Sequence, residues 1–303
     1  MRIWVLHMPM NYIDVTKGLS NMKTLDNYLT MNYAQLKRIA REYGVLGSIL
    51  GSPLSNPKIA KNAKENGVLT WPLNLAPEKQ SGYQVCASAS EGCKKACLDT
   101  AGNPIYLAGK QKARKAKTVL FFENRPLFVA MLCLELQAAE RKAIKLGMAM
   151  AVRPNTTSDV LWEKYKVSFA GSRVSIADLM HTMAPLAKIY DYTKNPNRNV
   201  NKAFYTLTFS LSESNDALAL KELQNGTNVA VVFDTKRGQE LPLFYTLMGK
   251  VWPVINGDLT DYRPEDSTLC NEPCIVGLRA KGDAIGDKSG FVRSAKQSTF
   301  MAA

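Results

Sequence analysis

The chain has 303 residues, of which 46% are hydrophobic and 21% charged, a balance typical of a globular protein with one large domain or two ordinary ones. The formal net charge of +13 favours a polyanionic partner such as nucleic acid or an anionic cofactor, and it fits a merely basic surface equally well. No apolar run approaches the roughly 20 residues of a membrane span, and the opening MRIWVLHMPMNYID lacks a small-residue cleavage site, so we expect a cytosolic protein without membrane contact.

The first elements predicted along the chain are helical. Residues 1–60 are predicted to form an arm and a helix, the helix covering residues 24–43 until Gly44 stops it. Residues 68–76 predict the first strand, followed by a polar loop to about Pro104. Two helices come next, a lysine-rich one over residues 107–123 and one from about residue 126 to 146, capped by Asn124.

Strand and helix signals alternate from residue 148 onward. Strands are predicted at residues 148–152, 188–192, 203–210, 228–234, 251–256 and 274–279, and helices at 175–186 and 215–224. This alternation predicts an α/β domain over residues 61–285, either a parallel sheet or a partial or complete (βα) barrel, and a loose C-terminal tail over residues 286–303. Polar residues follow several of the strands, as they do at a barrel mouth, although loops are polar in any case.

Three of the six cysteines lie within twelve residues, in the loop after the first strand: Cys86, Cys93 and Cys97. In a reducing compartment, clustered cysteines bind metal or carry out chemistry more often than they form disulfides. Their thiolates fit an iron–sulfur cluster, a zinc site or a redox centre without metal. The C-x2-C knuckle typical of structural zinc is missing, and neither of the two histidines is nearby.

A four-iron cluster needs a fourth ligand, and the sequence leaves it open. The position can face a small molecule, or it can be filled by Cys270, Cys274 or an oxygen ligand such as Asp159. The remaining cysteine, Cys133, lies among apolar residues of a predicted helix and is expected in the core.

Further candidate binding residues are polar positions at or after the ends of predicted strands: Arg153, Asn155, Ser158, Asp159, Asp191 and Asp258. Arg153 would pair a carboxylate or phosphate, Asp191 would act in acid–base chemistry, and Asp258 would help to hold magnesium. Each has an ordinary alternative as a helix cap, a surface salt bridge or an internal ion pair. The lysines of residues 107–123 likewise either bind nucleic acid or form a solvated face.

Several runs, in order over about residues 50–285, resemble the phage-encoded gene product 88 proteins. The runs are Leu73–Cys86, Gly92–Gly102, Leu120–Glu123, Arg153–Glu163, Tyr190–Lys194, Gly257–Asp258 and Ile275–Gly282. The resemblance implies a phage origin, hence a location in the cytoplasm of the bacterial host. It also implies, more loosely, a kinship to radical S-adenosylmethionine (SAM) proteins.

Radical SAM proteins are partial α/β barrels of the TIM type, in which three cysteines after the first strand hold a four-iron cluster with one open iron. The kinship therefore implies a [4Fe-4S] cluster on Cys86, Cys93 and Cys97, with SAM as a second cofactor and radical or redox chemistry. Two features depart from that family: the spacing is C-x6-C-x3-C instead of C-x3-C-x2-C, and Arg153–Asp159 replaces the glycine-rich SAM segment. The alternatives are a non-catalytic iron–sulfur protein of the phage, structural or redox, and a metal-stabilised nucleic-acid-binding module.

Overall fold

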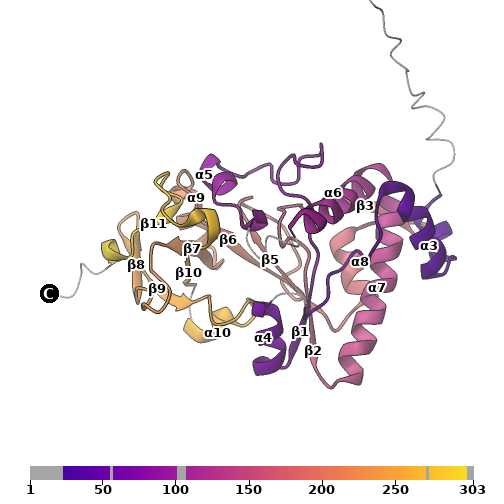
Figure 1. The fold of residues 1–303 in the computed structure, drawn as a ribbon. Coiled ribbons are helices and arrows are strands. Elements are labelled where there is room, and N and C mark those ends of the chain that lie inside the picture. The colour runs from indigo at the N-terminus through magenta and orange to yellow at the C-terminus, as the bar shows by residue number, and fades with distance from the viewer. Residues whose placement is uncertain (1–22, 55–56, 101–106, 271–272, 299–303) are drawn as a thin grey trace, which may run out of the picture.

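The protein is built around one mostly parallel β-sheet (Figure 1). The computed structural model describes residues 23–54, 57–100, 107–270 and 273–298, so the predicted arm over residues 1–22 lies outside the described residues. The strands of this sheet are β1 (Val68–Pro72), β2 (Ala149–Arg153), β5 (Lys188–Thr193), β6 (Tyr205–Ser210), β7 (Val229–Phe233), β8 (Phe244–Leu247), β9 (Lys250–Asn256), β10 (Ile275–Arg279) and β11 (Val292–Arg293).

The strand order is β1-β2-β5-β6-β7-β10-β9-β8, and every neighbouring pair is parallel except β8 with β9. β11 also runs parallel to β7, on the same side as β6 but beyond the residues that β6 pairs. The predicted α/β class is confirmed. Among the described residues the pairings form an open sheet, with β1 at one edge and β8 at the other, rather than a closed barrel.

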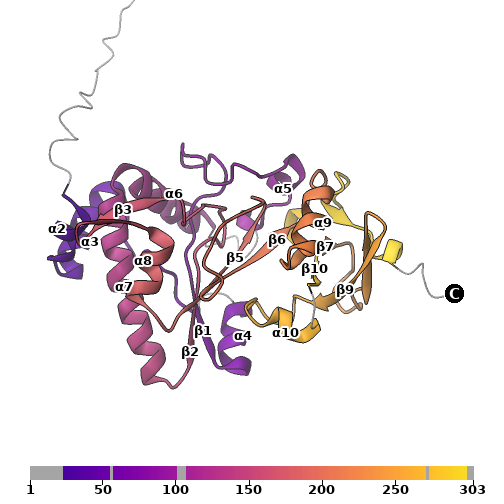
Figure 2. The same cartoon turned by 180° about the vertical axis from the view of Figure 1, so that it is seen from behind.

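The helices cover the sheet unevenly, with most of them gathered beside β1 and β2 (Figures 1 and 2). The α-helices are α2 (Leu25–Leu29), α3 (Tyr33–Ala40), α4 (Pro57–Asn66), α5 (Glu91–Lys95), α6 (Leu107–Glu123), α7 (Arg125–Lys145), α8 (Ile176–Met183), α9 (Asp216–Gln224) and α10 (Asp266–Cys270). Short 3-10 turns are η1 (Arg41–Tyr43), η2 (Leu98–Thr100), η4 (Gly282–Ala284) and η5 (Ala295–Ser298). Over the described ranges, no helix is both long and apolar enough to cross a membrane.

Local capping explains where several helices begin. Asn124 accepts a hydrogen bond from the Leu127 amide at 3.2 Å and Pro126 stands in the first turn, which confirms the predicted start of α7. The single helix predicted over residues 24–43 is instead α2, α3 and η1. The reason is Asn32, whose side chain accepts from the Gln35 amide and starts a new helix.

The two faces of the sheet are covered differently. Leu69 and Met150 point to the face that α7 covers, within the main apolar core, which also takes in residues of α2 and α3. On the opposite face, Tyr190 packs edge-on against Tyr262, at 5.9 Å between ring centroids. The N-terminal helices therefore share the core of the α/β domain, and residue 60, the expected boundary, lies inside α4.

Several elements were not predicted. They include α4, α10, strand β8 and a separate hairpin of β3 (Lys166–Phe169) and β4 (Ser172–Ser175). The C-terminal tail was predicted to be loose from residue 286. In its described part this differs from the structure, because β11 pairs with β7 and the Asp234 amide donates to the Arg293 carbonyl.

Candidate functional site

The segment that carries Cys86, Cys93 and Cys97 is bonded to the carboxyl ends of three neighbouring strands. Just before Cys86, the Val85 carbonyl accepts from the Asp159 amide, after β2, at 2.8 Å. Ser88 donates to the side chain of Asn195, after β5, at 2.7 Å. Ser90 and the Gly92 amide donate to Glu213, after β6, at 2.7 and 2.8 Å. These contacts place the cysteines at the sheet edge where parallel α/β proteins bind ligands.

The three thiols form no disulfide, are partly buried and lie near one another. Burial raises the pKa of Cys86 to about 11, and Asp159, Cys97 and Cys93 add smaller contributions in the same direction. Burial also raises the pKa of Cys97. A raised pKa is the opposite of what an activated nucleophilic or redox cysteine requires. As they stand, no three His, Cys, Asp or Glu side chains within the described ranges are arranged to hold a metal ion.

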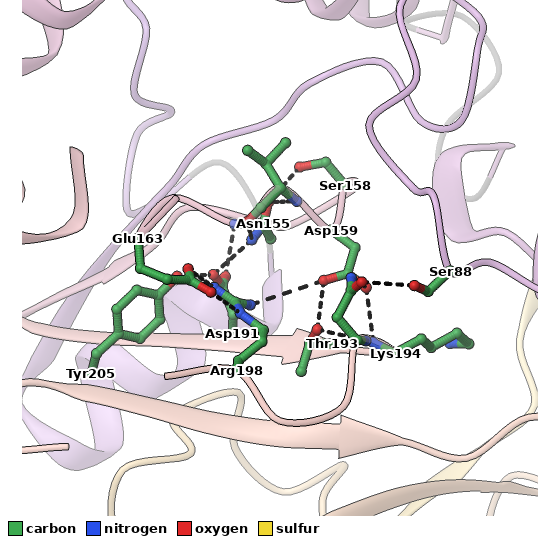
Figure 3. Close-up of polar contacts among 12 residues, drawn as sticks. Ser88, Asn155, Ser158, Asp159, Glu163, Asp191, Thr193, Lys194, Arg198 and Tyr205 are labelled. Atoms are coloured by element: carbon green, nitrogen blue, oxygen red, sulfur yellow. Dashed lines mark hydrogen bonds and ion pairs between the residues drawn. The ribbon is translucent and has the colours of Figure 1, made fainter. Parts of the chain in front are cut away.

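Asp159 joins the cysteine segment to the end of β5 (Figure 3). One carboxylate oxygen accepts from the Thr193 hydroxyl at 2.7 Å. The other accepts from the Lys194 amide at 2.8 Å and from the Asn195 side chain at 3.0 Å. Of the predicted site residues outside the cysteine trio, Asp159 is the one whose charge acts on Cys86.

Asn155, Ser158 and Asp191 form a buried network beneath this edge (Figure 3). The Asn155 backbone and side-chain amides each donate to Asp191 at 2.8 Å. The Asn155 side-chain oxygen accepts from the Ser158 hydroxyl and the Val160 amide at 2.8 and 2.9 Å. The network holds the loop after β2 against β5. Its polar groups are hydrogen-bonded to one another inside the protein.

Arg153 and Asp258 are each held by opposite charges. Arg153 Nη1 lies 2.8 Å from a carboxylate oxygen of Asp261. Asp258 accepts from Lys281 Nζ at 2.8 Å and from the Arg279 amide at 3.0 Å. These contacts match the internal ion-pair alternative, and Asp258 lies after β9, four strands away from β5 in the sheet.

Cys274 lies at the opposite edge of the sheet from the cysteine segment. Its backbone amide donates to the Asn228 side chain at 3.0 Å, and its carbonyl accepts from Val229 at the amino end of β7. Cys270 ends α10, which lies at the opposite end of the strands from α5 (Figure 1), and after burial its thiol contributes to the raised pKa of Cys274. Neither residue is placed to be the fourth ligand of a cluster on the trio. Cys133 is buried in α7, as expected.

Ser90 is the residue of this site that the sequence alone does not single out, whereas Glu213 follows a predicted strand and Gly92 lies in the predicted cysteine loop, and the contact between these two is not predicted. Ser90 caps α5, and a serine followed by a short polar helix is a signal that could have been found. The partnership of Glu213 with Ser90 and Gly92 joins positions far apart in the chain, so no local pattern reveals it.

Residues 49–295 match the Gene product 88 family, a phage gene-product family, and the chain belongs to it. No curated protein and no solved structure matches the chain.

Proposed function

We propose that this member of the Gene product 88 family is an iron–sulfur protein whose cluster is bound by Cys86, Cys93 and Cys97. The observation that carries the proposal is the convergence of three cysteine thiols, none of them in a disulfide, at the carboxyl edge of a parallel sheet, on a segment bonded to three successive strand ends. Thiolates are the protein ligands that iron–sulfur clusters require. When bound, such a cluster supplies one-electron transfer. Metal binding would displace the protons of these thiols.

The strand order supports a partial barrel of the TIM or radical SAM type as the setting of this cluster. β1, β2, β5, β6 and β7 are parallel and neighbour one another in chain order, as successive strands of a (βα) barrel do. SAM is not included as a cofactor, because the residues expected to bind it have protein partners: Asn155 bonds to Asp191, and Arg153 pairs with Asp261. Asp159 is the remaining protein candidate for the fourth iron, which would make the cluster a structural or redox group.

Anaerobic purification from iron-supplied cells, with iron and sulfide analysis, tests this function. We expect about four of each per chain, and a large loss in Cys86→Ser, Cys93→Ser or Cys97→Ser. The double variant Cys270→Ser/Cys274→Ser is the matched control and keeps its iron, because those residues lie at the other edge of the sheet. Wild-type protein that carries zinc or no metal contradicts the proposal. A separate measurement tests the fourth iron: if spectra of the reduced protein change when SAM is added, that iron is open.

A second candidate function is the binding of an anionic partner, such as nucleic acid in the host cytoplasm. Lys110, Lys112 and Lys115 are exposed on α6, and the acidic residue of that helix, Glu123, is its last. The aromatic Phe121 is buried in the core and does not stack bases, so recognition would rest on charge.

A further inference from the structure

We propose that Glu213 is a positioning residue for Cys93, acting through Ser90 and Gly92. The inference rests on the proposed role of Cys93 as a cluster ligand. It assigns the support of that ligand to a carboxylate on a different strand end, in the way that outer groups orient metal ligands elsewhere.

The first contact runs through one hydroxyl group. Ser90 donates its single hydroxyl proton to Glu213 Oε2 at 2.7 Å. Its oxygen then accepts the backbone N–H of Cys93 at 3.2 Å. Because a hydroxyl has only one proton, the carboxylate fixes the rotation of Ser90 and leaves its lone pairs facing Cys93. Glu213 thereby determines where the first turn of α5, and with it Cys93, is held.

The second contact is a close approach that only glycine permits. The Gly92 amide donates to Glu213 Oε1 at 2.8 Å. A Cβ atom on Gly92 would lie 2.7 Å from Glu213 Oε2 and 2.5 Å from the Ser289 hydroxyl. Residue 92 is therefore enclosed between Glu213 and the C-terminal segment, and any side chain there would push α5 away from the carboxylate.

Glu213 itself stands on a braced turn. The Ser212 amide donates to the Asn215 side chain at 2.7 Å, and Asn215 donates back to the Ser210 carbonyl at 3.1 Å. Arg293 of β11 donates to the Ser212 carbonyl at 2.6 Å. A carboxylate on so constrained a turn can hold a partner segment in one place.

The test is the rate at which iodoacetamide alkylates Cys93 in metal-free protein, measured by peptide mass spectrometry. We expect Glu213→Ala, Ser90→Ala and Gly92→Ala each to raise that rate about fivefold, the effect of one lost hydrogen bond. Ser90→Thr keeps the hydroxyl and restores the slow rate. Glu240→Ala removes an exposed carboxylate and Gly109→Ala fills open space, so both controls leave the rate unchanged.

Alkylation of the buried Cys133 in the same samples reports whether each variant is folded. An unchanged Cys93 rate in folded Glu213→Ala and Ser90→Ala overturns the positioning role. Iron content is measured in parallel, and we expect both alanine variants to lose iron while Ser90→Thr retains it. If wild-type protein binds no iron, the proposed function fails, yet the alkylation rates still decide whether Glu213 positions Cys93.

Discussion

Asp191 lies within β5, and its side chain is fully buried. Its oxygens accept from the Asn155 backbone and side-chain amides at 2.8 Å and from the Tyr205 hydroxyl. Burial raises the pKa of Asp191 to about 7, against the opposing influence of Arg198 and of these hydrogen bonds. The carboxyl group therefore holds its proton over a pH range in which the unfolded chain has already released it.

This difference in pKa predicts the direction in which stability depends on pH. Because the folded-state pKa is the higher one, Asp191 stabilises the fold at low pH, and that contribution is lost as pH rises from about 4 to about 7. In Asp191→Asn the dependence disappears. The wild-type free energy of unfolding, taken relative to the variant, should fall by about 1.4 kcal/mol per pH unit in this window. Urea titrations at several pH values measure it, and a constant difference contradicts the prediction.

The sequence identified Asp191, Asn155 and Asp159 as polar residues at strand ends but did not reveal which of them meet. Asp191 is 36 positions from Asn155, so their contact depends on β2 and β5 being neighbours in the sheet. Arg153 and Asp258 were chosen by the same reasoning, and both are held by ion pairs. Position after a strand predicts the edge of the sheet on which a side chain lies, and not what it bonds.

At the scale of elements, β10 packs closely against β9 at Gly277. A Cβ atom there would lie 2.8 Å from Val254 Cγ1 and 3.2 Å from Leu241 Cδ1. Gly277→Ala should lower the free energy of unfolding by about 1–3 kcal/mol, because a packed β-branched side chain has little room to move.

Chemical denaturation followed by circular dichroism measures the effect of Gly277→Ala. Gly47→Ala is the matched control, since nothing lies within 4 Å of a Cβ at that position. Equal stabilities of the two variants would show that β9 and β10 tolerate wider spacing.

Elements with a strong local pattern were predicted well. The apolar run of β7 and the capped, apolar α7 were found near their observed bounds. β8 alternates buried and exposed residues over only four positions, and β11 is two residues long, so neither carries enough pattern to be recognised. Both depend on pairing with distant strands.

For the whole molecule, the net charge of +13 leads to a prediction about salt. If Lys110, Lys112 and Lys115 contact three phosphates, affinity for a single-stranded oligonucleotide should fall roughly 18-fold between about 50 and 200 mM salt. Replacing these three lysines with Gln should flatten the dependence. Replacing the exposed Arg141, Lys142 and Lys145 on α7 removes equal charge and should not. Fluorescence anisotropy measures the affinity of both triple variants. Binding that does not depend on salt would contradict recognition of nucleic acid through these lysines.

The alternation of strands and helices predicts the α/β class. It does not predict whether the sheet is open or closes into a barrel. Strand order is set by pairings such as β10 between β7 and β9, which join segments in an order different from the chain. The cysteine trio is predicted at the carboxyl edge because the loop that carries it comes after β1 and before α6. Its surroundings on Glu213, Asn195 and Asp159 come from later strands and required the structure.

The place of β11 has a consequence for the protein as it is synthesised. Ser289 and β11 are synthesised well after the cysteine segment, and Gly92 lies against Ser289. The cysteine segment therefore acquires these surroundings only after Ser289 has been synthesised. A chain that terminates before Ser289 would lack the residue against which Gly92 packs, so the cysteine segment would lose one side of its enclosure.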